Sequence, residues 1–281
     1  MSSACESCAQ KDGCTSQDTC EKKNGIEKIP CNALSDIKCV IGIASGKGGV
    51  GKSFVTATLA SKLASQGLKV GIMDADITGP SIPRAFGLKG MLEVNDKEMI
   101  IPAVTGNGIK AVSLNLLLED ESSPVIWRGP VLSGLVRQFW SEVEWGMLDV
   151  LLIDMPPGTG DIPLTLFQSI PLNGLVLVST PQELVSMIVA KAGNMASMMN
   201  VNILGMVENM AYTICPHCGE KMSLFGNDEV LTKEAAEAGM IILDKLPLDP
   251  SVTALVDSGK TDEVDTSELL GRTSEAIKAL L

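Results

Sequence analysis

The sequence predicts an α/β protein whose mostly parallel, twisted sheet carries helices on both faces. From Cys39 onward, short apolar runs alternate with patterns of helical period. Runs such as Val150-Leu151-Leu152-Ile153 are continuously apolar, which is typical of parallel strands covered on both faces. A glycine-rich segment separates the first apolar run from the first helical pattern. These three observations together predict the α/β class.

The expected elements follow in chain order. Strands are predicted near 39–45, 68–73, 148–153, 174–179, 201–207 and 240–243. Helices are predicted near 52–65, 130–142, 183–198, 228–238 and 266–280. An insertion at 88–114 interrupts the alternation, and its polar Asn95-Asp96-Lys97 turn between two apolar runs indicates a β-hairpin. Residues 1–38 have few large apolar side chains and no periodicity, so they are expected to form a cysteine-rich tail before a single domain at 39–281.

Composition restricts the classes of function. The chain has 281 residues, 45% of them hydrophobic, and a net charge of −12, which disfavours nonspecific nucleic-acid binding. Apolar runs stay short of the roughly 18 residues that a membrane span needs. The first cation, Lys11, lies among polar residues with no apolar segment after it, so we expect no signal peptide and a cytoplasmic protein without membrane contacts. Eight cysteines in a reducing compartment indicate metal or redox chemistry.

The strongest motif is a phosphate-binding loop between the first strand and the first helix. Gly46, Gly51, Lys52 and Ser53 fit the pattern G-x-x-x-x-G-K-[ST]. Glycines allow the backbone N–H groups to surround a phosphate at the helix N-terminus. Lys52 is then expected to reach the β- and γ-phosphates, and the Ser53 hydroxyl to ligate Mg²⁺. The expected nucleotide-binding residues are Gly46, Lys47, Gly48, Gly49, Val50, Gly51, Lys52, Ser53 and Phe54.

Lys47 is unusual because it is a second lysine inside this loop. Its side chain cannot easily turn back onto phosphates held by its own backbone. We therefore expect it to point toward a nucleotide bound by a neighbouring subunit. The alternative is a solvated lysine in a glycine-rich turn.

Polar residues at the ends of later strands complete the expected nucleotide site, because ligands bind beyond the carboxyl ends of parallel strands. Asp154 is expected to hold the water shell of Mg²⁺, and Gly158 to place an N–H near the γ-phosphate. Asp76 is the candidate that orients the attacking water, although Asp74 and Asp76 could instead cap a turn. The Asn209 amide could bind the adenine edge, or serve in ordinary turn chemistry.

A second chemical signal is Cys215-Pro216-His217-Cys218-Gly219. Two thiolates at this spacing can hold one edge of a zinc ion or an iron–sulfur cluster, and such sites normally have four ligands. A symmetric dimer with the two loops face to face would supply the other pair. The remaining alternatives are a thioredoxin-type redox pair and a zinc knuckle, and His217 could be a spare ligand or an exposed loop residue.

These motifs resemble a known family. The loop from Gly46 to Ser53 is similar to the deviant Walker A loop of the MinD, ParA and nitrogenase iron-protein group, in which the extra lysine contacts nucleotide across a dimer. More narrowly, the chain resembles the Mrp (ApbC, Ind, Nbp) branch. The motifs that carry this resemblance are Asp74–Ser81, Trp127–Pro130, Asp154–Asp161, Glu208–Met210 and the pair Cys215 and Cys218.

The resemblance implies a Mg-dependent ATPase that binds a transient [4Fe-4S] cluster between two subunits and passes it to apo-proteins. It implies that Cys215 and Cys218 bridge the cluster, and that the catalytic residues are Lys47, Lys52, Asp76 and Asp154. The tail resembles that of Nbp-type members in Cys5, Cys8 and Cys14, whereas the first cysteine of their motif is missing. Cys20 does not match the motif but is a candidate for the fourth ligand. A second cluster, zinc or no metal all remain open for the tail.

Other functions share these motifs. A positioning switch like MinD or ParA would need a membrane or DNA surface, and the C-terminal apolar stripe at 269–281 has only Arg272 and Lys278 as cations. A zinc-stabilised regulatory ATPase and a non-catalytic scaffold would keep the loop and the cysteines. An electron-transfer ATPase like the nitrogenase iron protein is disfavoured, because its cluster ligands are widely separated in sequence. Cys31 is expected to be a linker thiol and Cys39 a buried apolar residue.

Overall fold

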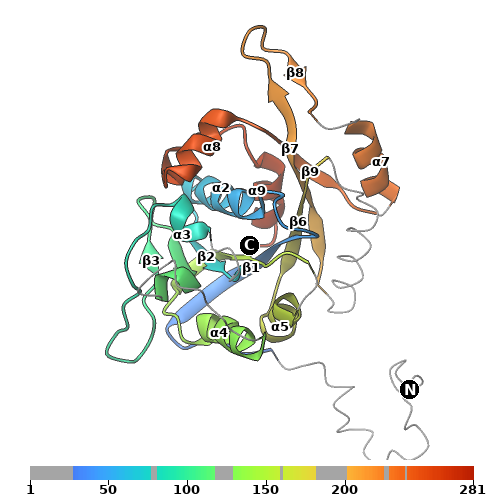
Figure 1. Ribbon diagram of the computed structural model, residues 1–281. Helices are drawn as coiled ribbons and strands as arrows, with labels where there is room; N and C mark the ends of the chain where they lie inside the picture. Colours follow the sequence, from blue (N-terminus) through green and yellow to red (C-terminus); the bar gives the residue numbers. More distant parts are fainter. Residues whose placement is uncertain are drawn as a thin grey trace, which may run out of the picture.

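The computed structural model describes residues 28–76, 81–117, 129–158, 161–181, 201–224, 228–237 and 239–281. In these residues a nine-stranded, mostly parallel sheet lies between two layers of helices (Figure 1). The predicted α/β class is therefore confirmed. Within the same ranges, no helix combines the length and the apolar character needed to cross a bilayer.

The centre of the sheet is formed by four parallel strands. β1 (Ser35–Ser45) pairs with β5 (Gly146–Asp154) on one side and with β6 (Gly174–Ser179) on the other. β2 (Val70–Asp74) pairs with β5, in a register that sets Asp74 beside Asp154. Because all four strands run the same way, their carboxyl ends meet at one edge of the sheet.

The outer strands extend this sheet in both directions. β4 (Lys110–Ser113) adds in parallel to β2, and the short β3 (Ala103–Val104) adds to β4 in antiparallel orientation. On the other side, β7 (Ile203–Ile214) pairs with β6 and with β9 (Ile242–Pro247), both in parallel. The far end of β7 pairs with β8 (Lys221–Met222) and forms a ribbon that extends beyond the helical layers (Figure 1).

Helices cover both faces. α4 and α5 pack together on one face, whereas α2, α3, α8 and α9 lie on the other, and α7 lies near β9 (Figure 1). Two 3-10 turns, η2 and η3, complete the described helical segments. The bounds are α2 (Lys52–Ser65), α3 (Ile82–Ala85), η2 (Leu114–Leu117), α4 (Gly129–Ser141), α5 (Asp161–Ser169), α7 (Asp228–Glu237), α8 (Pro250–Asp257), η3 (Thr261–Glu263) and α9 (Gly271–Lys278).

A separate apolar cluster fills each face of the sheet. Under α2, the fully buried Leu59 and Leu63 pack with the strand residues of the same face. Under α4 and α5, Phe139, Trp145 and Phe167 are fully buried. Alternate residues of each central strand serve the two clusters, which explains why these strands are continuously apolar in sequence.

The central strands of the sheet lie where the sequence predicts them, whereas some of the outer strands and helices differ from the prediction. β4, α5 and α8 were not expected, and α9 is shorter than the predicted segment at 266–280. β4 has only four residues and follows an irregular insertion, so it gave no separate signal. The expected helix at 183–198 lies outside the described residues.

The predicted insertion hairpin is present as a small, well-bonded turn. Val94 and Ile100 form an antiparallel bridge, and Ile100 also bridges Val143 in parallel. The Asn95 side chain accepts hydrogen bonds from the backbone N–H groups of Lys97 (2.8 Å) and Met99 (3.0 Å). The insertion is thus attached to the body at the strand that leads into β5.

The chain before the sheet is anchored to the α4 and α5 face. The Trp140 indole donates to the Ile29 carbonyl at 2.7 Å, and the Asn32 amide donates to the Val143 carbonyl at 2.7 Å. β1 itself begins at Ser35, inside the segment that the sequence assigned to the tail. Residues 1–27 lie outside the described residues.

We expect Gly259→Ala to destabilise the fold through a backbone clash between α3 and α8. A Cβ on Gly259 would lie 2.7 Å from the Gly87 Cα and 2.9 Å from its nitrogen, and neither atom can move alone. The control is Gly90→Ala, since Gly90 also has positive φ but an open surrounding. Gly259→Ala should lower the free energy of unfolding by about 1 to 3 kcal/mol more than the control. Equal denaturation midpoints for the two variants would contradict the clash.

Candidate functional site

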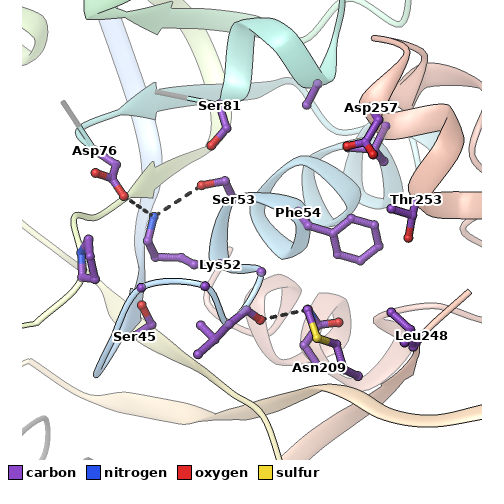
Figure 2. A pocket seen from close by; sticks show the side chains of 18 of the residues that line it. Ser45, Lys52, Ser53, Phe54, Asp76, Ser81, Asn209, Leu248, Thr253 and Asp257 are labelled. Carbon is purple, nitrogen blue, oxygen red and sulfur yellow. Dashed lines mark hydrogen bonds and ion pairs between the residues drawn. The ribbon is translucent and has the colours of Figure 1, made fainter. Parts of the chain in front are cut away.

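The glycine-rich loop lies between β1 and α2 and lines a cavity of about 440 Å³ (Figure 2). Gly51 is the N-cap of α2 and adopts the left-handed conformation, with φ +80°. A side chain there would meet the Asn209 amide, whose nitrogen would lie 2.2 Å from the added Cβ. With no capping side chain at Gly51, the first N–H groups of α2 are available to an anion.

The Asp154 carboxylate contacts the two loop residues that are expected to bind phosphate and Mg²⁺. It ends β5 and is fully buried. Its carboxylate accepts from the Lys52 ammonium at 2.8 Å, the Ser53 hydroxyl at 2.5 Å and the Thr56 hydroxyl at 2.9 Å. Lys52 is only 6% exposed, so its charge depends on this contact.

Two further aspartates lie at the same edge of the sheet. Asp76 lies 3.4 Å from the Lys52 ammonium (Figure 2). Asp74 is buried and accepts from the Ser113 hydroxyl at 3.1 Å. Burial, and then the nearby charge of Asp154, raise the pKa of Asp74 well above its usual value. The sequence analysis gave Asp74 no ligand role, although its position at the end of a strand is itself a signal.

This arrangement fits Mg²⁺ and a nucleotide. Carboxylate and hydroxyl oxygens are the ligands that Mg²⁺ prefers. Ser53 and Asp76 line the cavity, and the buried Asp154 carboxylate accepts a hydrogen bond from the Ser53 hydroxyl. The buried negative charge is only partly matched by Lys52, which favours a divalent cation. The cavity volume also falls in the range of small-molecule sites.

Gly158 and Asn209 both contact the loop or the strand before it. The Gly158 N–H donates to the Ser45 carbonyl at 3.0 Å. The Asn209 amide donates to the Val50 carbonyl at 2.9 Å (Figure 2). Their expected roles toward the γ-phosphate and the adenine remain predictions.

Several residues to which the sequence analysis gave no binding role also line the cavity. They come from α3, from the end of β9 and from α8, opposite Phe54 (Figure 2). They are Ser81, Arg84, Ala85, Pro247, Leu248, Thr253, Val256 and Asp257. The sequence does contain a signal for α8, because an aspartate followed by proline is a typical helix start. In the structure Asp249 is the N-cap of α8 and accepts from the Ser251 N–H at 2.8 Å.

Lys47 is exposed at the rim of the same cavity. Its backbone carbonyl accepts from the Ser45 hydroxyl at 3.0 Å, which fixes the start of the loop. An exposed lysine at the rim is compatible with a contact to a second subunit. That contact remains a prediction.

The cysteine pair forms a tight turn between β7 and β8. The Gly219 N–H donates to the Cys215 carbonyl, and the Cys215 N–H to the Glu220 carbonyl, both at 2.9 Å. Cys215 is half-buried and Cys218 exposed. The backbone N–H groups of His217 and Cys218 lower the pKa of the Cys215 thiol, with a further contribution from the Cys218 side chain. The turn, which we call the cysteine knuckle (residues 215–219), is therefore shaped to hold a thiolate.

One chain supplies two thiols at this place. In the described part of the chain, no group of three or more histidine, cysteine, aspartate or glutamate side chains is arranged to hold a metal ion. The other described cysteines lie elsewhere: Cys39 is fully buried in β1, and Cys31 is in the anchored segment before it. The candidate tail ligands Cys5, Cys8, Cys14 and Cys20 lie outside the described residues.

The fold and the loop define the chain as a P-loop nucleotide-binding protein. Its lysine and serine contact a buried strand-end aspartate, and its sheet is mostly parallel, as is typical of this class. A sequence model of the ParA family, described as NUBPL iron-transfer P-loop NTPase, matches residues 36–280. The chain belongs to this family, as the resemblance predicted.

Relatives cover nearly the whole chain. An iron-sulfur cluster carrier protein of Clostridium perfringens is 47% identical over 272 residues, which are 92% of this chain and 94% of the relative. The cytosolic Fe-S cluster assembly factor CFD1 of Kluyveromyces lactis is 40% identical over 237 residues, 80% of this chain and 82% of the relative. The solved structure of a nucleotide-binding protein of Archaeoglobus fulgidus in complex with ADP is 46% identical, has a TM-score of 0.73, and covers 82% of this chain and 89% of its own.

We expect Cys215 to react with iodoacetamide at lower pH than Cys31 and Cys39 do. Backbone N–H groups favour its thiolate, whereas burial raises the pKa of Cys39 to about 11 and also raises that of Cys31. The measurement is peptide-resolved alkylation of the metal-free protein across pH. Cys218→Ser should raise the midpoint of Cys215 only in part, because the backbone donors remain. A Cys215 midpoint at or above that of Cys31 would contradict this assignment.

Proposed function

We propose that the protein is an ATP-dependent carrier that binds a transient [4Fe-4S] cluster at a dimer interface and transfers it to apo iron–sulfur proteins. One observation carries the proposal: a single chain combines a cavity at the phosphate-binding loop with one pair of neighbouring thiols, which would be half of a four-thiolate set. The names of the relatives, which include an iron-sulfur cluster carrier protein and a cytosolic Fe-S cluster assembly factor, support it.

The nucleotide site would hydrolyse ATP slowly, and faster in the dimer. Lys52 would bind the β- and γ-phosphates, and Asp76 would orient the attacking water. Mg²⁺, held through Ser53 and Asp154, would supply charge neutralisation of the phosphates. Lys47 would reach the nucleotide of the other subunit, so the faster turnover would require two copies.

The cluster is cargo in this scheme. Cys215 and Cys218 of each of two copies would supply its four ligands, which is the usual number for such clusters. ATP would draw the copies together, and hydrolysis would release the segments after Asp76 and Asp154, weakening the shared site.

The protein would work in the cytoplasm, where its relative CFD1 is named as cytosolic, without nucleic-acid or membrane partners. A net charge of −12 agrees with this choice of partners. For the tail residues Cys5, Cys8, Cys14 and Cys20, a second cluster, zinc and no metal all remain open.

Lys47→Ala should reduce ATP turnover by roughly 10³-fold, by analogy with cations that act across a subunit interface. The exposed Lys97→Ala is the matched control and should keep full turnover. Phosphate release is the measurement, with circular dichroism to show that the monomer is folded. If Lys47→Ala retained turnover, the trans role would be ruled out.

Cluster binding is tested in the full chain with Cys5, Cys8, Cys14 and Cys20 replaced by serine. After anaerobic reconstitution with iron and sulfide, this chain should hold half a [4Fe-4S] cluster, or about two iron atoms, per subunit. A further Cys215→Ser change should abolish the cluster absorbance and leave ATP binding intact, and His217→Ala should change neither. Zinc instead of iron after reconstitution, or unchanged absorbance in Cys215→Ser, would contradict the proposal.

A further inference from the structure

β7 physically connects the nucleotide cavity with the cysteine knuckle. Asn209 and Met210, in its middle, line the cavity, and Ile214, its last residue, precedes Cys215. Five residues of one strand therefore separate a group that contacts the phosphate-binding loop from a thiol of the cysteine knuckle.

The strand is interrupted between these two points. Its pairing with β9 advances four residues along β7, from Glu208 to Tyr212, but only two along β9, from Lys245 to Pro247. Met210 lies within this bulge with a φ of +56°, in the left-handed region. That conformation is costly for a residue with a Cβ and is uncommon outside glycine, asparagine and aspartate.

The strand is fixed on both sides of the bulge. Before it, the fully buried Glu208 lies 3.1 Å from the Lys245 ammonium. After it, the Tyr212 carbonyl accepts from the Leu248 N–H at 2.7 Å, and the Thr213 hydroxyl donates to the Leu248 carbonyl at 3.2 Å. Any strain in this part of β7 is therefore concentrated at Met210.

The bulge is also tied directly to the loop that would hold phosphate. The Asn209 amide donates to the Val50 carbonyl at 2.9 Å, and both residues line the cavity (Figure 2). The contact with Gly51 leaves no spare room, since a Cβ there would lie 2.2 Å from the Asn209 nitrogen. A change in the loop backbone must therefore move Asn209, and Met210 is the next residue.

We propose that the Met210 bulge is a conformational switch that passes the state of the phosphate-binding loop to the cysteine knuckle. A strained residue keeps its conformation only because contacts around it hold it there. It can change conformation when one of these contacts changes. When phosphate reorients the Val50 peptide, Asn209 follows, Met210 changes its backbone angles, and the ribbon that carries Cys215 shifts. This inference rests on the proposed function for its purpose, because it explains how the nucleotide would regulate release of the cargo.

The test uses the metal-free full chain, kept monomeric as checked by light scattering, so that no subunit contact shields the thiols. Alkylation rates of Cys215 and Cys218 are measured by peptide mass spectrometry with and without saturating Mg-ADP. The wild-type rate should change about fivefold, at the lower end of typical coupling between two sites. In Met210→Gly and Met210→Asn, which both tolerate positive φ, the ratio of the two rates should fall to roughly one.

The matched control is Glu98→Gly. Glu98 also has positive φ, at +61°, but it lies in the turn of the insertion hairpin. This variant should respond to Mg-ADP as the wild type does. A wild type without any response, Met210 variants with the full response, or loss of the response in Glu98→Gly would overturn the proposal.

The same proteins separate this inference from the proposed function. If iron and sulfide give no cluster but alkylation responds to Mg-ADP through Met210, the carrier function fails and the switch stands. If a shared cluster forms while alkylation ignores Mg-ADP, the carrier function stands and the switch is wrong.

Discussion

The site depends on one buried carboxylate. Asp154 ends the strand beside the centre of the sheet and is fully buried, so its charge needs partners inside the protein. Lys52, Ser53 and Thr56, from the first turns of α2, supply them. Leaving such a charge unpaired would cost several kcal/mol. The same contacts therefore orient α2 on the sheet and prepare the loop for phosphate.

The parallel register places the other carboxylates relative to this one. Asp74 is the direct neighbour of Asp154 across β2 and β5, and Asp76 follows two residues later toward Lys52. Burial, and then the nearby charge of Asp154, raise the pKa of Asp74. The protein alone leaves this corner with excess negative charge, which suits a site built to receive a magnesium nucleotide.

The fold class and the motifs of the candidate site could be read where the signal is encoded in adjacent residues, and the chemical roles given to these residues remain predictions. The loop from Gly46 to Ser53, Asp154 at the end of an apolar run, and the Cys215 and Cys218 pair all carry their signal within a few positions. The side of the cavity formed by α3 and α8 escaped prediction, because it depends on the close packing of Gly87 against Gly259, which are far apart in the chain. The left-handed conformation of Met210 could not be predicted either, because methionine rarely adopts a positive φ.

The cysteine knuckle shows what local encoding permits. Its shape comes from hydrogen bonds that begin and end within residues 215–220, so the spacing of the two sulfurs is set without help from the globular body. The ribbon formed by β7 and β8 can move as a unit while the spacing of the two sulfurs stays unchanged. Substitutions in the ribbon can therefore change its movement without changing the geometry of the two thiols, so the two properties can evolve independently.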